Sequence, residues 1–125
     1  MTHTFTLTPG SYHIADACYL LAEDTYESVE VFDGMMEVDE VDTIPVGDKS
    51  FIYYNLGADG TFAVHDKNTD EELGVYGIEA ANISIAPVEM AESDDQTHRF
   101  TLTEETTVIV YHDAIVIGDL FRVRL

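Results

Sequence analysis

Basic residues, cysteine and tryptophan are all scarce in this sequence of 125 residues. Five Lys and Arg side chains stand against 25 Asp and Glu, so the formal net charge is −20 at pH 7. A chain this acidic is repelled by phosphate backbones and by anionic bilayers, which disfavours direct binding to nucleic acid or to a membrane. The single cysteine, Cys18, excludes an intramolecular disulfide and fits a reducing compartment.

Long apolar runs are also missing. No run approaches the roughly 20 residues that a membrane-spanning helix needs, and the first residues lack the basic start of a signal peptide. We therefore expect a soluble cytoplasmic protein. Hydrophobic residues make up 46% of the chain, with seven Tyr and six Phe, which is enough for a packed core. The length suits one domain over residues 1–125.

Short apolar stretches separated by turn residues predict a chain made mostly of strands. Asp59-Gly60 is typical of a tight hairpin turn. A second turn is expected over 66–71, and His112-Asp113 would join the last two strands. The stretches read as strands are 3–8, 11–14, 18–21, 50–56, 62–65, 73–76, 82–85, 99–103, 106–111 and 114–125.

One stretch shows helical spacing instead. Its apolar residues recur every three or four positions, and its acidic residues recur on the other side, which predicts a helix over about 24–36 capped by Asp24 or Thr25. The apolar row is Tyr26, Val29, Phe32 and Met36. The acidic row is Glu23, Glu27 and Glu30.

The predicted fold class is α+β and mainly β. About nine short strands would form an antiparallel sandwich or a partly open barrel, with one acidic helix near residues 24–36 covering a side or an end. The apolar strands of 106–125 could leave an unpaired edge on which a second copy would pair, so a homodimer is among the partners considered.

The most unusual part of the sequence is residues 23–48, called here the acidic segment, which holds ten carboxylates and no Lys or Arg. Three explanations stay open: a solvating surface or adaptation to high salt, a binder of several cations, and mimicry of a nucleic-acid backbone by carboxylates. The candidate partner-binding residues are Glu23, Asp24, Glu27, Glu30, Asp33, Glu37, Asp39, Glu40, Asp42, Asp94 and Asp95.

The pattern H-x-x-D-x-C contains residue types that bind transition metals. It is formed by His13, Asp16 and Cys18. On a strand, residues of opposite parity point to opposite faces, so His13 and Asp16 would diverge, and no second Cys/His cluster completes a site. We expect no metal here.

The pattern D-x-N-x-D opens like a calcium-binding loop. It is formed by Asp66, Asn68 and Asp70. Glu71 stands where that loop requires glycine, and Gly77 stands where it requires glutamate. An Asx-rich turn explains these residues better.

No catalytic signature is present, so we predict neither an enzyme nor a cofactor. Cys18, Ser11 and Ser84 lie in no nucleophile motif. Tyr53 and Tyr54 are read as core or cross-strand aromatics. A third class of function, a small-ligand binder or enzyme that uses the mouth of a β-barrel, would draw on histidines. The candidates are His13, His65 and His112.

Residues 10–19, GSYHIADACY, resemble a set of small uncharacterised phage and bacterial proteins that open with a G-x-Y-x-I-G-D-P-C-Y-like segment before an acidic helix. Residues 57–62, GADGTF, look like their G-D-G-x-Y/F hairpin, and residues 77–89, GIEAANISIAPVE, look like their V-D-S-G-x-I-G-I-x-P-x-E stretch. Ala15 and Ala17 replace the family's Gly and Pro, and Ala81-Asn82 replaces Ser-Gly. The resemblance implies a phage or prokaryotic origin and a mostly β fold, and it implies no activity.

These observations lead to a binding function. We expect a phage-type acidic protein that mimics nucleic acid and blocks the basic DNA- or RNA-binding surface of a host protein, working in the host cytoplasm. Restriction, CRISPR or related defence complexes, or polymerase-like proteins, are the expected targets. The alternatives are a halophilic or otherwise acid-adapted cytosolic protein, and the small-ligand binder.

Overall fold

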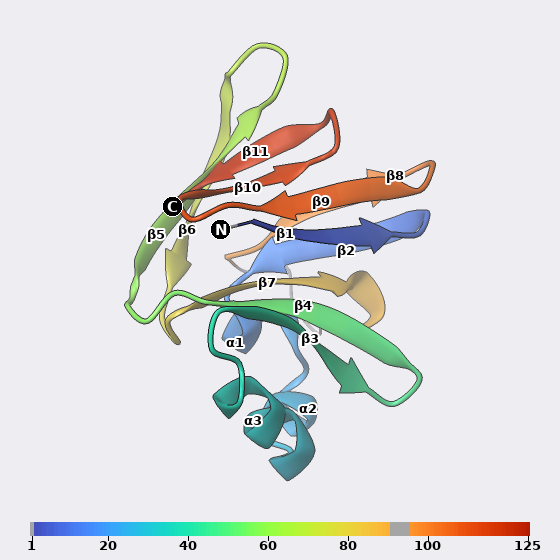
Figure 1. The fold of residues 1–125 in the computed structure, drawn as a ribbon, viewed down its shortest axis with the longest axis vertical. Helices are drawn as coiled ribbons and strands as arrows, with labels where there is room; N and C mark the ends of the chain where they lie inside the picture. The colour runs from blue at the N-terminus through green and yellow to red at the C-terminus, as the bar shows by residue number, and fades with distance from the viewer. Residues whose placement is uncertain (1, 91–95) are drawn as a thin grey trace.

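Two antiparallel sheets pack face to face in the computed structural model, which describes residues 2–90 and 96–125 (Figure 1). Sheet A has the order β1-β9-β10-β11-β5-β6, and sheet B has the order β3-β4-β7-β2-β8. The strands of sheet A are β1 (His3–Leu7), β9 (Thr106–Val110), β10 (Ala114–Ile117), β11 (Phe121–Arg124), β5 (Gly60–Asp66) and β6 (Glu72–Ile78). The strands of sheet B are β3 (Val41–Val46), β4 (Lys49–Asn55), β7 (Asn82–Pro87), β2 (Gly10–Ala15) and β8 (His98–Leu102). The fold is an α+β, mainly β sandwich, and the two sheets do not close into a barrel.

Short helices follow β2 and β7. The α-helices are α1 (Ala17–Leu20), α2 (Glu23–Tyr26) and α3 (Val29–Met36), and one 3₁₀ turn, η1, covers Val88–Met90. α1 packs against β7 and β2, and α3 packs against β3. In Figure 1, α2 and α3 lie at one end of the molecule, below the edge strand β3.

Aromatic side chains join the two sheets through the core. Phe100 on β8 meets Phe121 on β11 with ring centroids 4.9 Å apart and the rings nearly perpendicular. On sheet A, Phe62 packs against Tyr76 at 5.4 Å. The ring of His98 lies 5.2 Å from Phe121, and burial lowers the pKa of this histidine. Such rings remove large apolar areas from water and orient the sheets relative to each other.

The central strands of sheet B are covered on both faces, and their burial shows this. All but the last residue of β7 are buried, and β4 has a continuous buried run from Phe51 to Tyr54. A strand with one wet face would alternate buried and exposed residues. The helix α1 on the second face removes that alternation, and Tyr53 and Tyr54 are core aromatics, as predicted.

The mainly β sandwich is confirmed, as are the turn over 66–71 and the hairpin that joins β9 to β10. Of the eleven strands within the described residues, two have no predicted stretch of their own. One is β3, which contains Pro45. Proline cannot donate to a sheet ladder, but β3 is an edge strand, where that donor can be spared. The other arises because the turn Gly118–Leu120 divides the expected strand 114–125 into β10 and β11.

The prediction of a strand over 18–21 is wrong. Asp16 ends β2 and accepts a hydrogen bond from the backbone N–H of Cys18 at 3.0 Å, so the apolar run begins a short helix, α1. A short apolar run does not by itself distinguish a buried strand from a buried helix.

The predicted hairpin at Asp59-Gly60 is also wrong. β4 pairs with β3 and β7, whereas β5 pairs with β6 and β11, so this connection crosses from one sheet to the other. The Asp59 carboxylate accepts from the backbone N–H of Ala81 at 3.1 Å and ties the crossing to the turn before β7.

The expected sheet edge over 106–125 is a third error. β9, β10 and β11 each have a neighbour on both sides, and the edges of sheet A are β1 and β6. The stretch therefore has no free edge on which a second copy could pair.

Candidate functional site

Asp16 is a fully buried carboxylate that organises the chain just before the acidic segment. Its Oδ1 accepts from the N–H of Cys18 at 3.0 Å and from Asn82 Nδ2 at 3.1 Å. Its Oδ2 accepts from the N–H groups of Glu79 at 3.0 Å and Ala80 at 2.6 Å. Four donors satisfy the charge, so this carboxylate joins the start of α1 to the turn before β7.

The expected helix over 24–36 is two helices. α2 ends at Tyr26, and Ser28 has an extended backbone that begins α3. The Ser28 hydroxyl accepts from the N–H of Val31 at 3.3 Å and donates to the carbonyl of Thr25 at 2.9 Å. A serine that caps a new helix this way competes with continuation of the old one.

One face of α3 is anchored to the sandwich. Val31 and Met35 are buried, and Val38 continues the same row. Gly34 lies so close to β3 that an added Cβ would stand 3.2 Å from the Ile44 side chain. The helix therefore lies directly on the edge strand, and its other faces are turned to solvent.

The acidic segment presents its carboxylates to solvent. Every predicted binding residue on it is exposed except Glu40, which is half-buried and lies 3.6 Å from His3 Nε2. Within residues 2–90 and 96–125, none of its ten carboxylates pairs with Lys or Arg. The structure brings most of the predicted residues together on α2, α3 and the connection to β3, and Asp42 follows on β3 itself. Asp94 and Asp95 lie outside the described residues.

Most of the predicted apolar row faces solvent, although Tyr26 packs against the core. Val29, Phe32 and Met36 are 73%, 53% and 71% exposed, and Val31 and Met35 are buried in their place. Both rows have helical spacing, so periodicity alone could not decide which one faces the core. The second row, with Val38, was the signal that sequence reasoning missed. We call Val29, Phe32 and Met36 the α3 stripe.

The H-x-x-D-x-C residues serve structure. His13 Nδ1 lies 3.0 Å from the hydroxyl of Thr97, Asp16 caps α1, and Cys18 is on that helix rather than on a strand. Over the described parts of the chain, no three His, Cys, Asp or Glu side chains gather closely enough to hold a metal ion.

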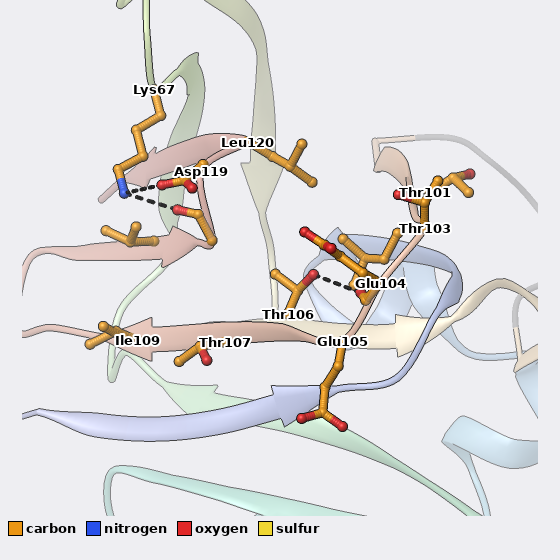
Figure 2. Close-up of a pocket in the computed structure, with 13 residues that line it drawn as sticks. Lys67, Thr101, Thr103, Glu104, Glu105, Thr106, Thr107, Ile109, Asp119 and Leu120 are labelled. Carbon is orange, nitrogen blue, oxygen red and sulfur yellow. Dashed lines mark hydrogen bonds and ion pairs between the residues drawn. The ribbon is translucent and has the colours of Figure 1, made fainter.

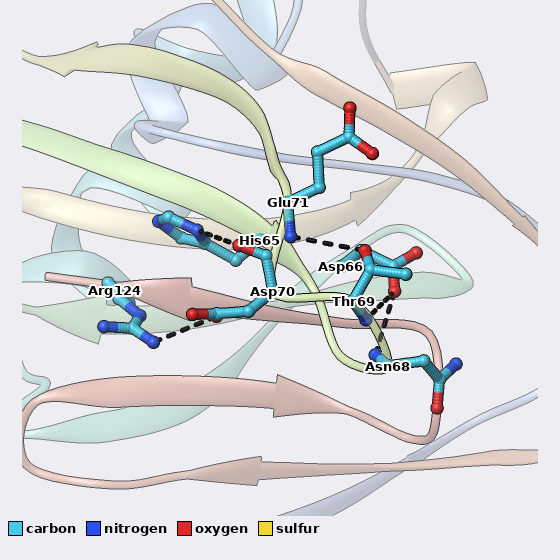
Figure 3. Close-up of polar contacts among 7 residues, drawn as sticks. All are labelled: His65, Asp66, Asn68, Thr69, Asp70, Glu71 and Arg124. Carbon is cyan, nitrogen blue, oxygen red and sulfur yellow. Dashed lines mark hydrogen bonds and ion pairs between the residues drawn. The ribbon is translucent and has the colours of Figure 1, made fainter.

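The D-x-N-x-D residues form the turn between β5 and β6 (Figure 3). The Asp66 carboxylate accepts from the N–H groups of Asn68 at 2.8 Å and Thr69 at 3.0 Å, and these bonds lower the pKa of Asp66. Asp70 pairs with Arg124 at 3.0 Å. The carboxylates are thus used by an Asx turn, as the sequence indicated, and by an ion pair that it did not indicate.

Two open hollows lie on sheet A. One, of about 360 Å³, is lined mainly by Thr and Glu side chains from the β8–β9 connection and by the β10–β11 turn (Figure 2). The Lys67 ammonium at its border donates to the carbonyl of Gly118 at 3.0 Å and lies 3.4 Å from Asp119. The other hollow, of about 650 Å³, includes Arg122 and Arg124. Both lie outside the sandwich core, so neither is the mouth of a barrel.

The serines and histidines considered for catalysis are separated. The Ser84 hydroxyl donates to Asn82 Oδ1 at 2.9 Å inside the core, and the Ser11 hydroxyl lies 2.9 Å from that of Thr101 on the surface. His65 Nδ1 lies 3.3 Å from the Asp70 carbonyl, and the His112 carbonyl accepts from the Tyr54 hydroxyl. The structure joins them into no nucleophile–base pair.

Cys18 is expected to be an unreactive thiol. Burial, followed by the charge of Asp16, raises the pKa of Cys18 to about 12. The thiolate is the reactive form, and a higher pKa lowers its amount faster than it raises its nucleophilicity, so alkylation at pH 8 should be about 30- to 100-fold slower than for a free cysteine. Iodoacetamide labelling followed by mass spectrometry measures this rate. It should keep rising with pH beyond 9, and a rate equal to that of the urea-unfolded chain would contradict the expectation.

No protein family, no curated protein and no solved structure matches this chain. The resemblance to small phage and bacterial proteins therefore stays a prediction. Within the described residues, none of the helices has the length and apolar character needed to cross a bilayer.

Proposed function

We propose that this protein is a nucleic-acid mimic that occupies the basic DNA- or RNA-binding surface of another protein. The observation that carries the proposal is the acidic segment, whose exposed carboxylates have no Lys or Arg partner in the described parts of the chain. Half of the net charge, −10 of −20, is concentrated on these 26 residues. Such crowding costs stability through self-repulsion, which a basic partner would relieve.

The helices give this charge a fixed arrangement. Carboxylates three or four residues apart on one helix have Cβ atoms about 5–6 Å apart, so they form rows of closely spaced negative charge, as phosphates do along a strand. α3 is held on β3 by Val31 and Met35, so the row on α3 has little freedom. Lysine and arginine side chains that normally bind phosphate oxygens could instead bind these oxygens.

Capture from a bacterial lysate tests the proposal. The tagged protein should retain one stoichiometric nucleic-acid-binding complex at low salt and release it at high salt, because the pairing charges are exposed and screened. Mass spectrometry identifies the complex, and added DNA or RNA should compete with the protein for it. A smear of many basic proteins, or complete failure of nucleic acid to compete, would overturn the proposal.

Circular dichroism in dilute buffer separates the mimic from the salt-adapted alternative. We expect the protein to be folded both without added salt and at molar salt. Unfolding in dilute buffer with recovery at molar salt would show that the charge is solvating, as in a halophilic protein.

A further inference from the structure

The α3 stripe is an apolar surface that the fold does not use. Val29, Phe32 and Met36 recur at i, i+3 and i+7, so they form one row along the helix. Each is more than half exposed. The side of α3 that holds the helix to the sandwich is the separate row that starts at Val31. Three large apolar side chains on an eight-residue helix therefore face water without a role in packing.

A row of carboxylates lies beside the α3 stripe. Glu30, Asp33 and Glu37 each follow a stripe residue by one position, which places them about 100° further around the helix. All three are exposed and have no Lys or Arg partner in the described residues. The stripe and its acidic row thus form one amphipathic surface.

The charge next to the α3 stripe selects its occupant. A second copy would bring two acidic segments together with no Lys or Arg between them. Anionic bilayers and nucleic acids carry charge of the same sign as the row. A protein surface that combines an apolar cleft with a rim of Lys and Arg complements both parts at once.

We propose that the α3 stripe inserts into an apolar cleft on the basic partner while Glu30, Asp33 and Glu37 pair with the cationic rim. This inference rests on the proposed function and adds the source of its specificity. A phosphate backbone offers negative charge but no aliphatic or aromatic side chain at this position, so the stripe distinguishes this chain from the nucleic acid that it displaces. A few well-packed anchor residues near the centre of an interface carry most of its binding energy, and buried aromatic side chains are common among them.

Two labelled peptides stand in for the partner surface and test the stripe directly. One is a helical peptide of about 18 residues with Leu on one face and Lys on the other. The second has the same composition in scrambled order, so it keeps the charge and loses the apolar face. Fluorescence anisotropy at about 50 mM and about 500 mM NaCl measures binding with the charges exposed and largely screened.

The amphipathic peptide should bind more tightly than the scrambled one at both salt concentrations. Phe32→Gln with Met36→Gln should lower the affinity for the amphipathic peptide by about tenfold or more. The affinity for the scrambled peptide should stay within about twofold of the wild-type value. Leu73→Thr with Val75→Thr removes exposed apolar side chains from β6 and serves as the matched control, with no change expected. Thermal unfolding checks that the variants fold.

Three results would overturn the inference. The first is equal affinity for the two peptides, and the second is an unchanged affinity for the amphipathic peptide in the Phe32/Met36 variant. The third is ultracentrifugation in which the wild type is a dimer and this variant is a monomer. If the proposed function itself fails, the result is different: charge reversal of Glu27 and Glu30 leaves the affinity for both peptides unchanged.

Discussion

Replacing Asp16 by alanine is expected to lower the free energy of unfolding by about 3–5 kcal/mol, the range for breaking a buried charged network. The substitution leaves four N–H groups without their acceptor: the backbone N–H groups of Cys18, Glu79 and Ala80 and one N–H of the Asn82 amide, which keeps its other bond to the Ala80 carbonyl. These groups are enclosed between α1 and the turn before β7, where water cannot replace the carboxylate at no cost. Urea unfolding followed by circular dichroism measures the change.

Asp16→Asn provides the sharper comparison. Each carboxylate oxygen of Asp16 accepts two hydrogen bonds, so either orientation of an asparagine amide points its NH₂ at two donors. We expect this nearly isosteric change to cost at least about 2 kcal/mol. Asp59→Ala is the matched control, because that carboxylate accepts one backbone N–H at the surface, and its loss should cost about 1 kcal/mol or less. An Asp16→Ala variant within about 1 kcal/mol of wild type would show that the network does not stabilise the fold.

Reversing two charges at the junction of α2 and α3 should weaken partner binding by about 10- to 100-fold at low salt, because Glu27→Lys with Glu30→Lys replaces two attractions by two repulsions. Both side chains are exposed, so the fold should survive, although Glu30 lies in the first turn of α3, where a lysine costs about 0.3–1 kcal/mol. The dissociation constant for the captured complex is the measurement.

A second pair of substitutions separates the effect of where the charges lie from the effect of the total charge. Glu104→Lys with Glu105→Lys makes the same change in net charge at the exposed β8–β9 turn, remote in the chain from the acidic segment. This variant should bind the complex within about threefold of wild type at moderate salt, since distant exposed charges are screened. Equal losses in the two variants would mean that net charge alone drives association and that the acidic segment has no special role.

The predictions that succeeded depended on local patterns. Alternation and turn residues identified most strands, and the Asx turn beginning at Asp66 followed from its own side chain. Pairing between strands depended on distant residues and was less accessible. Asp59-Gly60 has the local form of a hairpin turn, but β4 pairs with β7 and β5 pairs with β11, so the connection changes sheets, and Asp59 bonds to Ala81, 22 positions away.

The composition of the candidate site was predictable from the sequence, but the face of α3 that packs against the sandwich was predicted wrongly. Solvent exposure of the carboxylates follows from their charge, so the acidic segment could be located from sequence. The choice between the Val29 row and the Val31 row depended on where β3 lies, and helical periodicity carries no information about that strand. Asp16 was considered as a metal ligand and interpreted instead as an ordinary structural residue, without its partners. Its true partners include backbone groups of residues 79 and 80, which no sequence pattern marks.

The placement of the few cations affects how this molecule meets another. Lys49 on β4 and Arg99 on β8 belong to sheet B. The other three of the five cations lie away from the acidic segment: Lys67 is in the β5–β6 turn, and Arg122 and Arg124 are on β11, whereas α2 and α3 occupy the opposite end in Figure 1. Such a separation makes the molecule an electric dipole as well as a polyanion. The field of a basic surface would then exert a torque on it during approach and turn the helices forward before contact. Productive collisions would become more frequent, and this gain would vanish with added salt, independently of how long the complex lasts.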